Sequence, residues 1–209
     1  MLYLTLESDV KDYSLNNRWT FTNSGTLGTK GWLSCWCCWT SWYINLGTSA
    51  TSYLRTSSNK FTISMLVYID GYNSSNSRLF EFAVQNTIWI NMYHKSSWYL
   101  WCSPMATWID TTTSIWLQEW VHIVLTNDNG AWKLYKNWTE IWALSWASNN
   151  WFGIWPYSYQ NWCYIAASRD HTSWESLNWW LREFINENVC WSATDVSNYY
   201  TWIKNKLWI

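Results

Sequence analysis

The sequence predicts an all-β protein, built as a sandwich or barrel of antiparallel strands. Short segments that alternate apolar and polar residues recur along the chain and are separated by turn residues. Ser, Thr and Asn are abundant, helix-forming residues are few, and the chain has 2 Pro. The length of 209 residues fits a single domain that spans residues 1–209.

Charge and hydropathy argue against nucleic-acid binding and against a membrane span. The chain has 13 Lys and Arg against 14 Asp and Glu, a formal net charge of −1, so it lacks the basic surface that a nucleic-acid-binding protein needs. It contains no run of 18 apolar residues, so we expect no membrane span. Residues 1–7 have neither a basic start nor a long apolar run, which predicts no signal peptide.

The clearest strands are residues 61–69 and 120–126, which end at the turns Asp70-Gly71 and 127–130. Weaker alternation predicts strands at residues 1–7, 43–46, 52–55, 79–84, 88–93, 98–102, 163–167 and 181–185. Residues 12–17 are expected to form a polar turn, and residues 24–42, rich in Gly, Ser and Cys, give no assignment. Residues 195–207 have mild helical character, with Ser192 or Thr194 as the N-cap.

A hairpin is predicted where residues 132–136 and 139–143 alternate on either side of Asn137-Trp138. A two-residue loop of type I′ would give both central residues a positive φ, which Asn tolerates and Trp does not. We therefore expect Trp138 to be exposed at the tip. On this geometry, replacing Trp138 by Gly should stabilise the fold by about 1 kcal/mol.

The tryptophan content is anomalous, with 24 Trp against 7 Gly. Trp follows Asn four times, at Asn137-Trp138, Asn150-Trp151, Asn161-Trp162 and Asn178-Trp179, where a tight turn would favour Gly. We hypothesise that many of these residues are mistranslated Gly, because UGA is read as Trp in one variant genetic code and as Gly in another. A natural Trp-rich surface, a designed chain and an aromatic binding surface are the alternatives. Some tryptophans lie in apolar strand or helix segments, which indicates that they are genuine. These are Trp120, Trp132, Trp191 and Trp202.

Several segments together resemble the laminin-G-like family of the concanavalin A-like lectin and glucanase superfamily. The matching segments, in the family's order, are residues 12–17, 61–69, 119–128, 133–141 and 178–184, followed by 192–196. The resemblance implies a jelly-roll sandwich of two antiparallel sheets with a short C-terminal helix. It also implies a noncatalytic recognition module that binds carbohydrate or a surface, in a secreted, cell-surface or virion-associated protein. The alternative is a structural or decoration module of a virion or appendage that contacts partner protein chains.

The resemblance suggests two kinds of binding residue. Sugar-binding members use aromatic platforms on loops or on the concave face. The matching candidates in this sequence are Tyr93, Tyr99, Tyr157 and Tyr159. Some members hold Ca²⁺ through Asp side chains and carbonyl oxygens at the loop rim. The corresponding candidates are Asp70, Asp110, Asp128 and Asp170, while Arg182 stands where the family has another Asp. Apart from Ca²⁺, we expect no cofactor.

Catalysis is the less favoured interpretation, and we expect no enzyme activity. The superfamily's glucanases use paired carboxylates on one strand, and the nearest match, Glu7-Ser8-Asp9, lies in the wrong place and lacks aromatic flanks. Cys35, Cys37 and Cys38 form a single cluster rather than the two pairs that a zinc site needs. His122 alternates with apolar neighbours in a predicted strand, which indicates a structural role.

Overall fold

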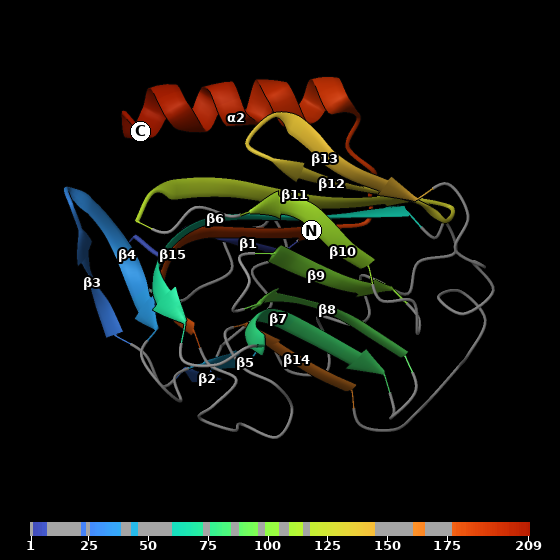
Figure 1. The fold of residues 1–209 in the computed structure, drawn as a ribbon. Helices are drawn as coiled ribbons and strands as arrows, with labels where there is room; N and C mark the ends of the chain where they lie inside the picture. The colour runs from blue at the N-terminus through green and yellow to red at the C-terminus, as the bar shows by residue number, and fades with distance from the viewer. Residues whose placement is uncertain are drawn as a thin grey trace.

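The protein is a sandwich of two antiparallel β-sheets, and a C-terminal helix packs on the outside (Figure 1). The computed structural model describes residues 2–7, 22–23, 26–38, 43–45, 60–72, 76–84, 88–95, 99–104, 109–114, 118–144, 161–165 and 177–209. The predicted fold class, a jelly-roll sandwich with a short C-terminal helix, is confirmed. No helix within these described ranges is long and apolar enough to cross a membrane.

The first sheet has the order β13-β12-β11-β6-β15-β4-β3, and β1 pairs with β15. Its strands are β1 (Leu2–Leu4), β3 (Thr26–Lys30), β4 (Leu33–Cys38), β6 (Lys60–Tyr72), β11 (Trp120–Asp128), β12 (Ala131–Lys136), β13 (Thr139–Leu144) and β15 (Leu177–Glu187). The second sheet has the order β10-β9-β8-β7-β14-β5-β2. Its strands are β2 (Thr22–Asn23), β5 (Ile44–Asn45), β7 (Asn76–Val84), β8 (Ile88–Lys95), β9 (Tyr99–Pro104), β10 (Ile109–Ser114) and β14 (Asn161–Ile165).

Most of the predicted strands are confirmed, with ends that move by a few residues. The segments predicted at 61–69 and 120–126 become β6 and β11, which pair in register from Trp120 opposite Tyr68 to Asp128 opposite Lys60. Strands β2, β3, β4 and β10 were not predicted. The strand predicted at 52–55 and the turn predicted at 12–17 lie outside the described residues.

The core fills the space between the sheets because alternate residues of each strand point inward. On β6 the inward positions are Phe61, Ile63, Met65, Val67 and Ile69, all at most 1% exposed. Residues of the second sheet complete the same cluster from the other side, namely Leu79, Phe80, Met92, Ile165 and Ile44. The intervening β6 residues therefore point to the outer face of the first sheet, where the helix lies.

Helix α2 (Ala193–Leu207) covers the outer face of the first sheet (Figure 1). Ser192 is the N-cap: its hydroxyl accepts from the backbone N–H of Asp195, and the Asp195 carboxylate accepts from the N–H of Ser192. Ser192 is thus the correct one of the two predicted caps. The apolar side of α2 packs on the sheet through Ile203 and Leu207, which contact Leu33 and Leu66.

The predicted hairpin at Asn137-Trp138 is present, but its turn is not type I′. Trp138 is 54% exposed, as expected, and Asn137 has φ 58°, whereas Trp138 is not among the residues with positive φ. The Asn137 side chain accepts from the backbone N–H of His122, and the Trp138 ring packs 5.0 Å from that of Tyr200 on α2. Because Trp138 does not have a positive φ, the stabilisation predicted for Gly at position 138 loses its basis. The Asn129-Gly130 turn has φ 51° and 96°, positive at both central residues.

The interpretation of the Asn-Trp pairs as turns is wrong at two of the four positions. Trp162 lies within β14 and Trp179 within β15, and Trp179 is fully buried in the core. A residue in the interior of a strand does not need to be Gly. These two pairs therefore do not support the hypothesis of mistranslated Gly. Asn150-Trp151 lies outside the described residues.

The end of α2 is a better place to test the hypothesis of mistranslated Gly. Trp208 is the C-cap in the left-handed conformation, with φ 54° and ψ 39°, and it is 83% exposed. Because Gly adopts this conformation without the Cβ penalty, we expect Trp208→Gly to raise the free energy of unfolding by about 1 kcal/mol in urea titrations. Trp208→Ala keeps the Cβ and is the control. An equal gain in both variants would contradict a backbone origin.

Candidate functional site

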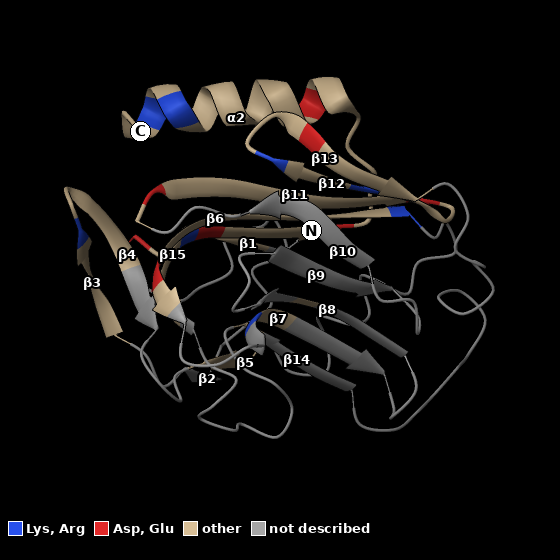
Figure 2. Ribbon diagram, in the orientation of Figure 1, with Lys and Arg blue, Asp and Glu red and all other residues tan. Residues whose placement is uncertain are grey.

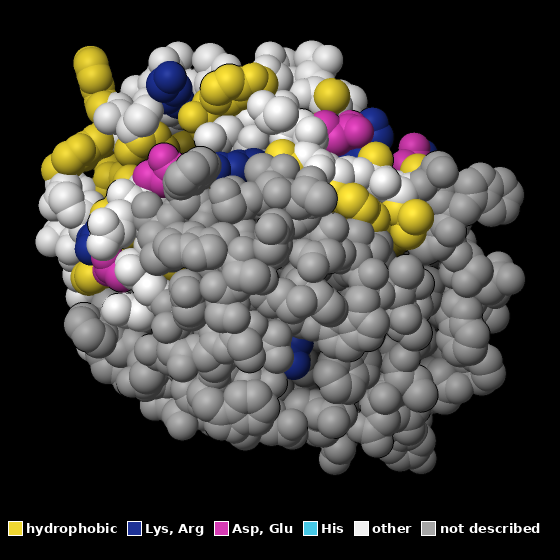
Figure 3. All heavy atoms as spheres, in the orientation of Figure 1, with side chains coloured by type: hydrophobic (Ala, Val, Ile, Leu, Met, Phe, Trp, Pro, Cys, Tyr) yellow, Lys and Arg dark blue, Asp and Glu magenta, His cyan; other side chains and the backbone are white. Residues whose placement is uncertain are grey.

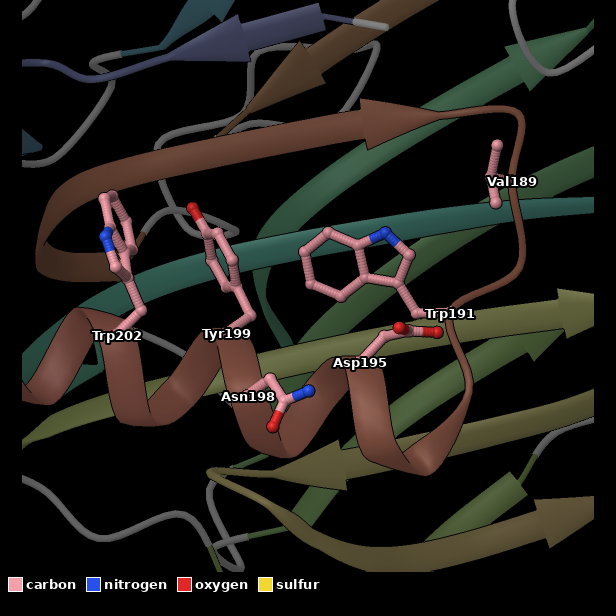
Figure 4. Close-up of a pocket in the computed structure, with 6 residues that line it drawn as sticks. All are labelled: Val189, Trp191, Asp195, Asn198, Tyr199 and Trp202. Atoms are coloured by element: carbon pink, nitrogen blue, oxygen red, sulfur yellow. The ribbon is translucent and has the colours of Figure 1, made fainter.

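An open groove runs along one side of α2, between the helix from Asp195 to Trp202 and the segment that precedes it (Figure 4). Its volume is about 500 Å³, within the range typical of small-ligand sites. We call it the α2 groove, lined by Val189, Trp191, Asp195, Asn198, Tyr199 and Trp202. Four of these residues come from α2 at the spacing that places side chains on one side of a helix.

Three aromatic rings form a continuous row in the groove. The ring centroids of Trp191 and Tyr199 are 4.9 Å apart, and those of Tyr199 and Trp202 are 5.4 Å apart. In Figure 4 the three side chains follow one another along the side of α2 that faces β15. Trp202 is 45% exposed, so part of the row is open to solvent. Such a row offers broad apolar surface to a flat ligand.

Trp191 is held in place from the sheet below. Its backbone N–H donates to the Thr62 hydroxyl at 2.9 Å, and that hydroxyl donates to the Val189 carbonyl at 2.6 Å. Its indole N–H donates to the carboxylate of Glu187 at the end of β15. Thr62 belongs to β6 and points to the outer face of the first sheet. The sheet therefore fixes the first ring of the row before any ligand binds.

Polar groups lie beside the rings. One oxygen of the Asp195 carboxylate accepts from the Ser192 N–H at 2.8 Å and from its hydroxyl at 2.7 Å. These bonds lower the pKa of Asp195, so the side chain is ionised at neutral pH. The Asn198 amide is exposed. The Tyr199 hydroxyl is buried and has no hydrogen-bond partner within the described part of the chain. The groove thus combines apolar faces with an exposed carboxylate and an exposed amide.

His122 lies beneath α2 and is fully buried, in agreement with the structural role expected for it. Its Nε2 is 2.7 Å from the Ser64 hydroxyl, and its ring lies 5.6 Å from that of Tyr199 and 6.1 Å from that of Tyr200. Burial lowers the pKa of His122 to about 3, so the imidazole is neutral. His122 therefore packs under the groove as an uncharged aromatic group.

A charged cluster lies where β1 and β4 pair along β15. The guanidinium of Arg182 is 2.5 Å from the Glu7 carboxylate and donates to the Ser34 carbonyl at 2.8 Å. Glu183 is 6% exposed, and burial raises its pKa to about 7 against the opposing effect of Lys206 and Arg182. Arg182, which departs from the resemblance by replacing an Asp, thus serves as an ion-pair partner.

None of the predicted sugar-binding tyrosines is among the described residues that line the groove. Tyr93 and Tyr99 lie in β8 and β9 of the second sheet, and the structure does not describe their side chains. Tyr157 and Tyr159 lie outside the described residues. The groove, by contrast, stands on the outer face of the first sheet.

The predicted calcium ligands that are described do not come together. The two oxygens of Asp70 bind the Lys30 ammonium at 2.6 Å and the Trp180 indole N–H at 2.8 Å. Asp128 pairs with Lys60 at 2.9 Å, at the opposite end of β6 from Asp70. Asp110 lies in β10 with an undescribed side chain, and Asp170 lies outside the described residues. Among the described residues no three His, Cys, Asp or Glu side chains form a metal-binding group. Calcium binding remains a prediction.

The α2 groove is not among the sites predicted from the sequence. A signal was present, because Asp195, Asn198, Tyr199 and Trp202 share one side of the predicted helix. Trp191 and Trp202 were also among the tryptophans expected to be genuine. The contribution of Thr62 could not be read from the sequence, because it lies 129 residues before Trp191.

No family model and no curated protein matches this chain. Solved structures do match its fold. Domain 4 of AbnA, an extracellular GH43 arabinanase from Geobacillus stearothermophilus solved with arabinotriose, has a TM-score of 0.68 at 16% identity, covering 94% of this chain and 96% of that domain. A Trypanosoma rangeli sialidase mutant with trans-sialidase activity has a TM-score of 0.72 at 11% identity, covering 99% of this chain. Botulinum neurotoxin type C, described as entering cells through two ganglioside molecules, has a TM-score of 0.67 at 12% identity, covering 97% of this chain.

The match spans 33% of the sialidase chain and 51% of the neurotoxin chain, so it covers part of each of those proteins. At these identities the likeness shows the fold. The chain therefore has the β-sandwich architecture found in carbohydrate-binding and glycoside-hydrolase-like proteins.

Proposed function

We propose that this protein is a noncatalytic recognition module that binds carbohydrate in the α2 groove. The observation that carries the proposal is the row of Trp191, Tyr199 and Trp202 beside the polar side chains of Asp195 and Asn198, in one open groove. Sugars have an apolar C–H face that stacks on aromatic rings and hydroxyl groups that bond to amides and carboxylates. The groove presents both kinds of group at once.

The structural neighbours support this class of ligand, since AbnA domain 4 was solved with arabinotriose and the neurotoxin interacts with gangliosides. On this proposal the module acts at a cell surface, in a secreted protein or on a virion, where glycans are found. Its ligand is then a glycan or a surface polysaccharide.

Glycan-array screening followed by calorimetry on the intact chain tests the proposal. We expect Trp202→Ala to weaken binding of the best array ligand about tenfold, because the stacking contribution of one exposed ring is lost. Trp32→Ala is the matched control, since Trp32 is 60% exposed but lies outside the groove. Equal effects of the two variants, or no binding to any glycan, would contradict the proposal.

A structural module that contacts partner chains is the second candidate. It is favoured by exposed apolar side chains near the end of α2. Figure 3 shows hydrophobic groups gathered at this end of the molecule. Leu27 is 40% exposed and Trp32 is 60% exposed on β3 and the turn after it, and Trp208 is 83% exposed. On this alternative, Trp32→Ala would abolish an association seen by sedimentation, while Trp202→Ala would not.

A further inference from the structure

We infer that the α2 groove takes an amino sugar, with its ammonium group beside Asp195 and its apolar ring face on Trp191 and Tyr199. This inference rests on the proposed function and specifies its ligand class. It follows from the charge of the groove, from the aromatic row and from the position of one lysine.

The groove is negatively charged at the end where α2 begins. Asp195 is the one charged residue among the six that line it. Both of its hydrogen bonds from Ser192 fall on Oδ2, which leaves Oδ1 without a bond from the described residues. The Glu187 carboxylate, bound to the Trp191 indole, adds negative charge behind the first ring. A cationic group at this end would gain an ion pair, whereas an acidic sugar would be repelled.

The aromatic rings favour the same charge, because the face of an indole or phenol ring attracts a cation. The protein itself shows this at the other end of the row, where the Lys206 ammonium lies 4.6 Å from the centroid of the Trp202 ring. Figure 2 shows how charge is distributed along α2: an acidic residue lies near the start of the helix, and basic residues lie near its end. Lys206 already supplies a cation at the Trp202 end, so the ligand's ammonium belongs at the Trp191 end.

The test is calorimetric titration of the intact chain with oligomers of equal length made of glucosamine, N-acetylglucosamine or galacturonate. We expect the glucosamine oligomer to bind about fivefold more tightly than the N-acetylated one, as an exposed ion pair allows, and the galacturonate oligomer to bind most weakly. The preference should shrink as salt is raised. In Asp195→Asn the glucosamine and N-acetylglucosamine oligomers should bind equally.

Glu140→Gln is the matched control, because it removes an exposed carboxylate that pairs with Lys133 away from the groove. It should keep the preference. Thermal melts followed by circular dichroism show whether Asp195→Asn keeps α2, since Asp195 also belongs to the helix cap. If this variant does not fold, the salt dependence of the wild-type preference decides the question.

Equal binding of the glucosamine and N-acetylglucosamine oligomers to the wild type would overturn the inference and leave the proposed function standing. Failure of every oligomer and of the glycan array would overturn both. Binding of tetramethylammonium as tight as that of the glucosamine oligomer would overturn the role of the sugar ring.

Discussion

We expect the stability of the Glu183→Gln variant to depend on pH. Its free energy of unfolding should fall by about 1 kcal/mol for each unit that the pH is lowered from 6.5 to 4.5. The reason is that two buried groups have opposite pKa shifts. Burial raises the pKa of Glu183 to about 7, and burial lowers the pKa of His122 to about 3. Removing the Glu183 carboxylate leaves the effect of His122 uncompensated.

The signs follow from proton binding. Between pH 4.5 and 7, folded Glu183 keeps a proton that the unfolded chain releases, so its stabilising contribution is present at low pH and is lost as the pH rises through 7. Between pH 6.5 and 3, folded His122 stays neutral while the unfolded imidazole is protonated, so its contribution is present above pH 6.5 and is lost as the pH falls. From pH 4.5 to 6.5 the two slopes nearly cancel.

Urea unfolding at several pH values should therefore give opposite slopes for the two single variants. Relative to wild type, Glu183→Gln loses stability on acidification, whereas His122→Gln gains it by a similar amount. The double variant should follow the wild type. Taking each variant relative to wild type removes the titration of shared surface carboxylates. Parallel curves for Glu183→Gln and wild type would mean that Glu183 is ionised in the folded protein.

The sequence predicted the elements whose pattern is local. The alternation of 61–69 and 120–126 reflects one buried face, and β6 and β11 follow it. Ser192 and Asp195 stand three residues apart before an apolar helix side, which is a complete start signal for α2.

Elements set by distant contacts could not be predicted in this way. A Cβ at Gly28 in β3 would lie 3.2 Å from the Trp180 ring, a close contact made by a strand far along the chain. The turn at Asn137-Trp138 likewise contacts His122 and Tyr200, which are distant in sequence, and Trp138 is not among the residues with positive φ. The groove likewise depends on Thr62, so its residues were visible in the sequence while their assembly was not.

Ile203→Ala should lower the free energy needed to detach and unfold α2 by about 3 kcal/mol. Ile203 is 1% exposed and packs against Leu33, Leu66 and Leu207, so truncation leaves a cavity at the centre of this contact. Asn205→Ala, at an exposed position of the same helix, should change stability by less than about 0.5 kcal/mol. Hydrogen exchange of the α2 amides measures the difference.

The same variant separates docking of the helix from the integrity of the sandwich. The main core lies on the other face of the first sheet, between the sheets, and does not include Ile203. We therefore expect the α2 amides to exchange faster in Ile203→Ala while those of β6 keep most of their protection. Glycan binding should weaken with the loss of α2, because four groove residues lie on that helix. If β6 and α2 lost protection together, the helix would be part of the cooperative core, and the groove would open only when the whole domain unfolds.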